Sequence, residues 1–223
     1  MNLDIVTCID WDYRQWAITL FRSLSSEWRN RYIIAVGPGD WYQLSIQLNA
    51  TIIEQELNPN FDKVIWCQNV RMKHLCNLIQ DVHWLLQVDA DVRQNKPMNT
   101  AFFKKYKGVT FANRKEVGKE MKPMVDRFKI NAGWVLYKNH PTTITGLENI
   151  RKEFETYSNT PQWEQLMLLK YFPLTLPLPF KYVDEGVKGF RNTSHWFHCK
   201  GPGRKEMTDL NTWHDLTIIP QLT

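Results

Sequence analysis

The first half of the chain alternates short, apolar, β-branched runs with segments whose apolar residues recur at helical spacing. This alternation predicts strands at residues 3–9, 31–36, 51–53 and 84–92, and helices at residues 16–24, 41–48 and 64–80. Strands and helices in this order form a mainly parallel, doubly wound sheet with helices on both faces. The sequence therefore predicts an α/β fold whose ligands lie at the carboxyl ends of the strands.

The second half of the chain is less regular. Strands are expected at residues 108–112 and 130–137, and helices at residues 144–157 and 163–171. The three prolines of residues 172–180 exclude a central strand there, because proline cannot donate to a sheet ladder. Since neither an internal repeat nor a low-complexity linker interrupts the chain, we expect one domain over residues 1–223.

Two carboxylates, Asp89 and Asp91, stand one residue apart at the end of the apolar run that begins at Trp84. Residues that alternate along a strand share a face, so both side chains are expected to point the same way and hold one cation. Mn2+ and Mg2+ prefer carboxylate oxygen and keep positions open for water or a substrate phosphate. An Asp-x-Asp also occurs in solvated acidic turns, but its place at a strand end favours a metal site.

The charge balance narrows the class of partner. A net charge of +5 suits nucleic acid, an anionic membrane surface or a small phosphorylated ligand. The basic residues between positions 113 and 122 are mixed with acidic ones, which is typical of a solvated loop. Paired carboxylates at a strand end would repel nucleic-acid phosphates unless a cation intervened, so we favour a small phosphorylated ligand over nucleic acid.

Cysteine spacing and hydropathy predict the compartment. The chain has four cysteines without Cys-x-x-Cys spacing, which argues against a zinc site and a disulfide framework and favours reduced thiols. No apolar stretch reaches the length of a membrane span, and the N-terminus lacks a basic segment followed by an apolar one. We therefore expect a soluble, cytoplasmic protein with no membrane span and no cleaved signal.

Five short motifs occur in a fixed order along the chain. They are Thr7-Cys-Ile-Asp10-Trp-Asp12-Tyr13, Arg71-Met-Lys73, Asn131-Ala-Gly133, Glu164-Gln165 and His198-x-x-Gly201-Pro-x-Arg204. With the Asp-x-Asp between the second and third motifs, this order resembles the GT-A glycosyltransferases, and within them the retaining, metal-dependent family 8. The last motif departs from the family pattern, because arginine stands at position 204 where lysine is usual.

The resemblance implies a role for each motif. Asp89, Asp91 and His198 would bind Mn2+ or Mg2+, and Gly201 with Arg204 or Lys205 would contact the diphosphate of the donor. The remaining implied site residues are Asp10, Asp12 and Tyr13 at the nucleobase, Arg71 and Lys73 at the donor, and Asn131, Glu164 and Gln165 around the reacting sugar. Residues 1–92 would then form the nucleotide-binding half, and residues 93–223 the acceptor and sugar-binding half.

Several of these residues also have an ordinary structural explanation. Asp10 and Asp12 could cap the first turn of a helix, and Arg71 and Lys73 could be surface charges. Asn131 could be a turn residue, and Glu164 and Gln165 could simply begin a helix. His198 could be a core or surface histidine.

The activity that the resemblance implies is transfer of a sugar, with retention, from a UDP-linked donor to a glycan or glycoconjugate acceptor. A small enzyme without a membrane anchor fits a bacterial or viral protein. An inverting GT-A enzyme would share the Asp-x-Asp, and a metal-dependent nucleotidyltransferase or phosphohydrolase would also use paired carboxylates. A carbohydrate-binding relative without activity is a further alternative.

Overall fold

The computed structural model describes residues 3–98, 108–113, 130–156, 163–173, 175, 178, 183–185 and 194–198. Within this part of the chain, a six-stranded sheet has the order β3-β2-β1-β4-β7-β6. Its strands are β1 (Leu3–Asp10), β2 (Trp28–Val36), β3 (Thr51–Gln55), β4 (Trp84–Val88), β6 (Val109–Asn113) and β7 (Ile130–Lys138). The first four strands run parallel, and β7 is antiparallel to both β4 and β6.

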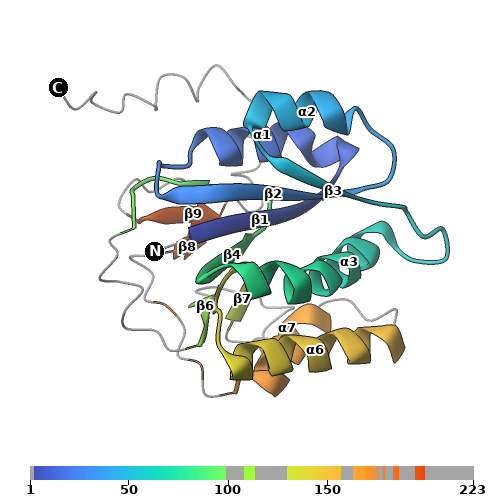
Figure 1. The fold of residues 1–223 in the computed structure, drawn as a ribbon, viewed down its shortest axis with the longest axis vertical. Helices are drawn as coiled ribbons and strands as arrows, with labels where there is room; N and C mark the ends of the chain where they lie inside the picture. Colours follow the sequence, from blue (N-terminus) through green and yellow to red (C-terminus); the bar gives the residue numbers. More distant parts are fainter. Residues whose placement is uncertain are drawn as a thin grey trace, which may run out of the picture.

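Helices cover both faces of this sheet. They are α1 (Arg14–Arg22), α2 (Trp41–Leu48), α3 (Lys63–Leu78), α6 (Pro141–Thr156) and α7 (Trp163–Tyr171), with short 3-10 turns η1 (Trp11–Tyr13) and η2 (Ile79–Asp81). Figure 1 shows α1 and α2 on one face, and α3, α6 and α7 on the other. The predicted α/β fold with a mainly parallel sheet is confirmed, and most element ends agree with the sequence prediction to within about three residues.

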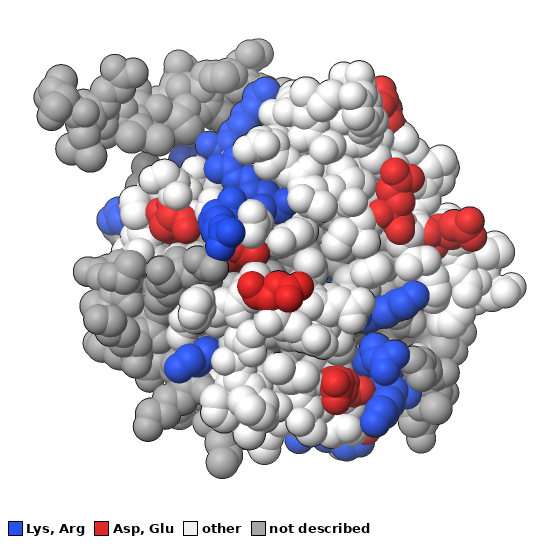
Figure 2. Space-filling model, viewed as in Figure 1, with Lys and Arg blue, Asp and Glu red and all other residues white. Residues whose placement is uncertain are grey.

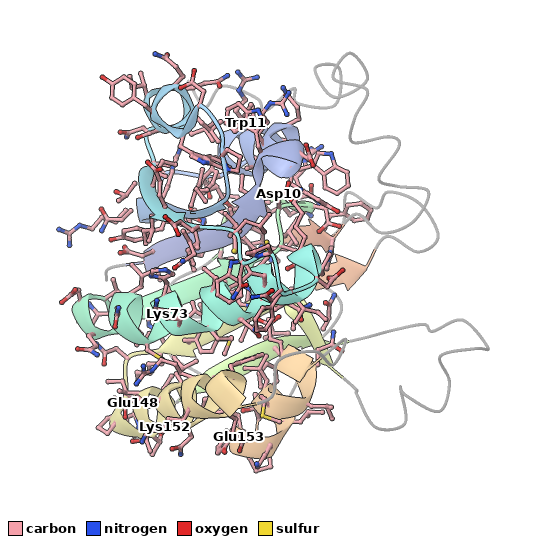
Figure 3. All side chains as sticks on the ribbon, turned by 90° about the vertical axis from the view of Figure 1, so that its right-hand side faces the viewer. Asp10, Trp11, Lys73, Glu148, Lys152 and Glu153 are labelled. Atoms are coloured by element: carbon pink, nitrogen blue, oxygen red, sulfur yellow. The ribbon has the colours of Figure 1, made fainter. Side chains whose placement is uncertain are left out.

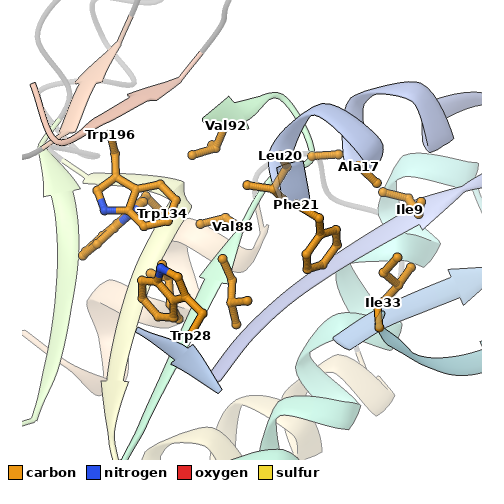
Figure 4. Close-up of a cluster of buried hydrophobic side chains, with 14 of the residues drawn as sticks. Ile9, Ala17, Leu20, Phe21, Trp28, Ile33, Val88, Val92, Trp134 and Trp196 are labelled. Carbon is orange, nitrogen blue, oxygen red and sulfur yellow. The ribbon is translucent and has the colours of Figure 1, made fainter. Parts of the chain in front are cut away.

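Each face of the sheet has its own hydrophobic core, because successive side chains of a strand point to opposite faces. Ile5 packs in the core under α1 and α2, and its neighbour Val6 packs in the core under α3 and α6. Figure 4 shows part of the first core, where Trp28 and Trp134 lie against Trp196. The ring centroids of Trp28 and Trp196 are 5.7 Å apart, so these tryptophans fill the interior.

A smaller sheet extends this first core. Its strands are β5 (Val92–Gln94), β9 (Trp196–His198) and β8 (Val183–Glu185), in that order. The sequence did not predict this sheet, because each strand is only three residues long and carries no periodic pattern. In its antiparallel register with β5, His198 lies opposite Val92 and thus next to Asp91.

The segment of the Asp pair differs from its prediction. β4 ends at Val88, and Asp89 to Asp91 form a turn that the N–H of Val92 closes by donating to the carbonyl of Asp89 at 3.1 Å. The expectation that the two aspartates alternate along one strand is therefore wrong. Their carboxylates nevertheless converge, because the turn folds back before β5 begins.

Surface charge and helix length bear on two further expectations. On the face shown in Figure 2, basic side chains form a short band and a separate group with acidic side chains beside them, so this face is not one continuous basic surface. No helix in the described ranges is long and apolar enough to cross a membrane.

Candidate active site

A cavity of about 230 Å³ opens at the carboxyl ends of β1 and β4. β2 and β3 continue the sheet on one side of β1, and β4 continues it on the other, so the strand order reverses between β1 and β4. Such a reversal leaves a crevice beyond the strand ends. The residues that line the cavity are Cys8, Ile9, Asp10, Tyr13, Val64, Cys67, Gln68, Arg71, Asp89, Ala90, Asp91, Asn131, Ala132, Gly133, Glu164 and Gln165.

Asp89, Asp91 and His198 form a cluster at this cavity. One potential ligand atom from each residue lies within 4.8 Å of the others. His198 Nε2 is 3.0 Å from Asp91 Oδ1 and 3.6 Å from Asp89 Oδ2. Two carboxylates with one imidazole form a donor set that suits a divalent cation such as Mn2+.

The Nε2 atom of His198 supports this assignment. The side chain is fully buried, and Nε2 makes no aligned hydrogen bond with any residue in the described part of the chain. The nearby oxygen of Asp91 is close enough but is not aligned as an acceptor. A buried nitrogen without a hydrogen bond is unfavourable unless an ion or a ligand satisfies it. The three residues therefore fit a cation that Nε2 and both carboxylates coordinate together.

Asn131, on β7, holds the other nitrogen of this imidazole. Its Oδ1 accepts the backbone N–H of Gly133 at 2.9 Å, and its Nδ2 lies 2.9 Å from His198 Nδ1. Metal-ligating histidines are commonly oriented by a hydrogen bond to the second ring nitrogen. Asn131 is therefore a positioning residue for His198. Asn131 also lines the cavity, which is compatible with its implied contact with a sugar hydroxyl. That contact stays a prediction.

Gly133 makes room for the cluster. A Cβ at this position would lie 2.2 Å from His198 Cε1 and 2.5 Å from Asp89 Oδ2. The backbone of Gly133 is close because its carbonyl accepts the N–H of Asp89 at 2.9 Å, where β7 runs beside the end of β4. Only glycine fits between these two side chains without displacing one of them.

Arg71, on α3, is the positive charge at the centre of the site. It donates from Nη1 to Asp89 Oδ1 at 2.7 Å and from Nε to Glu164 Oε1 at 3.1 Å, with a second bond from Nη2 to the other Glu164 oxygen. Gln87 donates to Glu164 Oε1 at 2.8 Å and accepts from the hydroxyl of Tyr137 at 2.9 Å. One oxygen of Asp89 is thus committed to Arg71, and the other faces His198.

The charge state of this network follows from burial and pairing. Burial alone would lower the pKa of Arg71, but the carboxylates of Glu164 and Asp89 outweigh it and hold the pKa well above its ordinary value. Burial raises the pKa of Glu164, against the opposing effect of Arg71. Arg71 therefore stays positively charged next to the metal-binding carboxylates. The bidentate geometry with Glu164 fixes the guanidinium in one orientation.

The turn after β1 supplies the rim of the cavity. Asp10 is buried and accepts the N–H of Asp12 at 2.8 Å, which is the capping role that its sequence also allowed. Lys63 Nζ lies 2.9 Å from the carboxylates of both Asp10 and Asp12, and these bonds raise the pKa of Lys63. Tyr13 lines the cavity with 39% of its surface exposed and packs edge-on against Trp16.

Several predicted residues do not meet in this cavity. Asp12 lies at the exposed end of the turn and does not line it. Lys73 is exposed on another face of α3 and borders a second cavity. Gly201, Arg204 and Lys205 fall outside the described residues, so their implied contacts with a diphosphate stay predictions.

Known structures share this fold. A glycosyltransferase involved in glycosylation of the major capsid of PBCV-1 is 13% identical, with a TM-score of 0.61 over 95% of this chain and 99% of that one. The apo-form glycosyltransferase GlyE of Streptococcus pneumoniae TIGR4 is 12% identical, with a TM-score of 0.61 over 91% of this chain. Mouse xyloside xylosyltransferase 1 is 8% identical, with a TM-score of 0.54 over 89% of this chain and 97% of that one.

This chain has a GT-A-like glycosyltransferase fold. It spans 55% of the length of GlyE. It also spans 46% of the bifunctional glycosyltransferase WbbM, which is 10% identical with a TM-score of 0.56. The sequence matches no known protein-family profile and no curated protein. The resemblance to family 8 therefore stays a prediction that similarity of fold does not test.

Some residues of the site were not predicted from the sequence. Gln87 carried a usable signal, since it is a single polar residue within a buried apolar strand and such residues need partners. Lys63 carried none, because its two partners lie 51 and 53 positions earlier in the chain, at Asp12 and Asp10. Cys8 and Cys67 were predicted as reduced structural thiols; both are free, and both line the cavity.

Proposed function

We propose that this protein is a metal-dependent glycosyltransferase that moves a sugar from a UDP-linked donor to a glycan or glycoconjugate acceptor, with retention, as in family 8. The observation that carries the proposal is the convergence of Asp89, Asp91 and His198 on one point at the crevice of a GT-A-like fold. A divalent cation bound there would neutralise negative charge on the departing diphosphate.

The position of each residue in the site then determines its role in binding the ion or the donor. Asp91 and His198, both buried, hold the ion from the protein side, and Asp89 shares its carboxylate between the ion and Arg71. Arg71 brings a fixed positive charge to the place where the diphosphate would lie. Glu164 acts on the donor through Arg71, because hydrogen bonds to Arg71 and Gln87 occupy its carboxylate.

Gln165 is the candidate for the residue that acts on the anomeric carbon of the donor sugar. It lines the cavity one residue after Glu164, and its Oε1 is buried without a hydrogen bond from any described residue. An amide oxygen aimed at the anomeric carbon would stabilise the positive charge that develops as the leaving group departs. Such a role favours retention, because the oxygen would act on the face opposite the leaving group.

The rim and the acceptor complete the proposal. Tyr13 offers an exposed aromatic ring for a nucleobase, next to the capped turn at Asp10. A glycan or glycoconjugate acceptor is supported by the structural neighbour that is involved in glycosylation of the major capsid of PBCV-1. In this proposal, the positive net charge of the chain favours binding of the anionic donor and not of a nucleic acid.

The test is turnover of UDP-sugars in Mn2+, followed by NMR, which reports the release of UDP and the anomeric configuration of the product. We expect wild-type protein to consume one UDP-sugar with retention, and Asp91→Asn to be inactive while it melts at a similar temperature. Inversion would exclude the role of Gln165. Hydrolysis of the diphosphate without sugar transfer would favour a phosphohydrolase instead, and equal activity of Asp91→Asn would remove the metal site from the reaction.

A further inference from the structure

A second cavity lies on another face of α3. Its volume is about 280 Å³, and its lining residues are Gln55, Asn58, Phe61, Trp66, Asn69, Val70, Lys73, Arg151 and Phe154. The α3 residues at positions 64, 67, 68 and 71 line the first cavity, whereas those at 66, 69, 70 and 73 line the second. A shift of two residues turns a helix by roughly 200°, so the two cavities lie on nearly opposite faces of one helix.

An aromatic platform forms one wall of this second cavity. The indole of Trp66 is held in place because its Nε1 donates to the carbonyl of Glu56 at 2.8 Å. Phe61 packs against it with a centroid distance of 5.1 Å and an angle of 48° between the planes. A fixed indole presents a flat apolar surface without a further loss of side-chain entropy on binding. Such surfaces suit the C–H faces of sugar rings.

Amide side chains stand next to this platform. The Oδ1 of Asn69 is buried and has no hydrogen bond to any described residue, so it needs a donor such as a hydroxyl group. Asn58 is fixed on the loop before α3, where its Oδ1 accepts the N–H of Asn60 at 3.0 Å. Gln55, at the end of β3, supplies a third amide. Amides that flank an indole are matched to a ligand with several hydroxyl groups.

Two cations complete the lining. Lys73 comes from α3 and Arg151 from α6, and no acidic side chain is among the described residues that line the cavity. Figure 3 shows Lys73 on α3 above α6, which also carries Lys152. Lys152 is exposed but is not part of the lining. A ligand that pairs with Lys73 and Arg151 would carry a carboxylate, sulfate or phosphate group.

We propose that this second cavity is a binding site for an acidic saccharide, with a sugar ring on Trp66 and its anionic group between Lys73 and Arg151. In naming a saccharide, the inference rests on the proposed function, since a glycosyltransferase acts on glycans. The cavity has room for one or two sugar residues. Because it lies across α3 from the metal ligands, its occupant would hold an acceptor chain at a distance from the bond being formed.

The test measures binding directly, without turnover. A glucuronate-containing tetrasaccharide and its carboxyl-reduced counterpart are titrated calorimetrically into the full chain at low ionic strength. We expect only the acidic form to bind well. Lys73→Glu should weaken binding about five- to tenfold, because repulsion replaces an exposed attraction, whereas Lys152→Glu, with the same charge change, should weaken it less than about twofold. Trp66→Leu should also weaken binding of the acidic tetrasaccharide, because it removes the aromatic platform.

Three results would overturn the inference: no binding of the acidic tetrasaccharide, equal binding of its carboxyl-reduced form, or equal effects of Lys73→Glu and Lys152→Glu. The thermal shift caused by UDP with Mn2+ separates this inference from the proposed function. If that shift is present and saccharide binding is absent, only the second site fails. If saccharide binding is present and the shift is absent, the proposed function fails and the second site stands.

Discussion

Substitution of Gly133 by alanine should separate metal binding from folding. The added Cβ would lie 2.2 Å from His198 Cε1, 2.5 Å from Asp89 Oδ2 and 2.9 Å from His198 Nδ1. Non-bonded carbon atoms pack at about 3.5 to 4.0 Å. The imidazole or the carboxylate must therefore retreat by roughly 1 Å or more, which exceeds the tolerance of about 0.2 Å for metal–ligand distances.

The structure also indicates how the substitution should affect stability and metal affinity. His198 is buried in β9 and is tied to Asn131, so it cannot move away without disturbing the small sheet. Overpacking of this kind reduces the free energy of unfolding by about 1–3 kcal/mol. Disturbed orientation of a metal ligand lowers metal affinity by about ten- to one hundredfold. The Gly133→Ala protein should therefore fold but bind Mn2+ much more weakly.

Calorimetric titration of Mn2+ and urea unfolding in EDTA measure these two effects separately. Gly108→Ala is the matched control, because a Cβ at Gly108 would meet no atom of the described residues within 4 Å. It should keep both the Mn2+ affinity and the stability of the wild type. If Gly133→Ala binds Mn2+ as tightly as wild type does, the cation is not held between Asp89 and His198.

Three further predictions concern Asn131, His74 and the two cysteines of the first cavity. Asn131→Ala should lower Mn2+ affinity about ten- to one hundredfold by releasing His198 Nδ1, and unchanged affinity would return Asn131 to a purely structural role. Burial, and after it the charge of Lys73, lower the pKa of His74 in the folded protein. Because His74 is then harder to protonate in the folded than in the unfolded chain, its contribution to stability is fully present above roughly pH 6.5, the ordinary pKa of histidine. That contribution is lost as the pH falls through the lowered pKa of the folded protein. Thermal melts of His74→Leu should therefore depend less on pH below that value, and an identical pH profile would contradict this. Iodoacetamide should label Cys67 before Cys8, since the hydrogen bond with Cys8 lowers the pKa of Cys67 while burial raises the pKa of Cys8. Mass spectrometry should also find that both thiols are labelled more slowly when UDP and Mn2+ are present. Equal labelling rates with and without UDP and Mn2+ would place both thiols outside the binding cavity.

The parallel half of the fold was predictable because its signals are local. The apolar, β-branched run of β1 and the helical spacing of α2 each lie within one short stretch of sequence, and the order of such stretches selects a doubly wound sheet. β9 was not predictable in this way. Its three residues are held by pairing with β5 and by the packing of Trp196 against Trp28, and both are contacts between distant parts of the chain.

The candidate site shows the same division. The Asp-x-Asp was visible in the sequence, but the reason given for its convergence was wrong, because a turn and not a strand brings Asp89 and Asp91 together. Only the resemblance linked His198 to this pair. The bonds of Glu164 to Arg71 and Gln87 join residues 93 and 77 positions apart, and nothing in the local sequence specifies them.

The central claim is that a divalent cation held by Asp89, Asp91 and His198 binds a nucleotide diphosphate in the first cavity. Its most direct test is calorimetric titration of UDP into the wild-type chain, in MnCl2 and in EDTA, with Asp91→Asn as the control. We expect one UDP to bind per chain in Mn2+, and no heat of binding in EDTA or with the variant. UDP binding of equal affinity in EDTA, or no binding of UDP in Mn2+, would contradict the account.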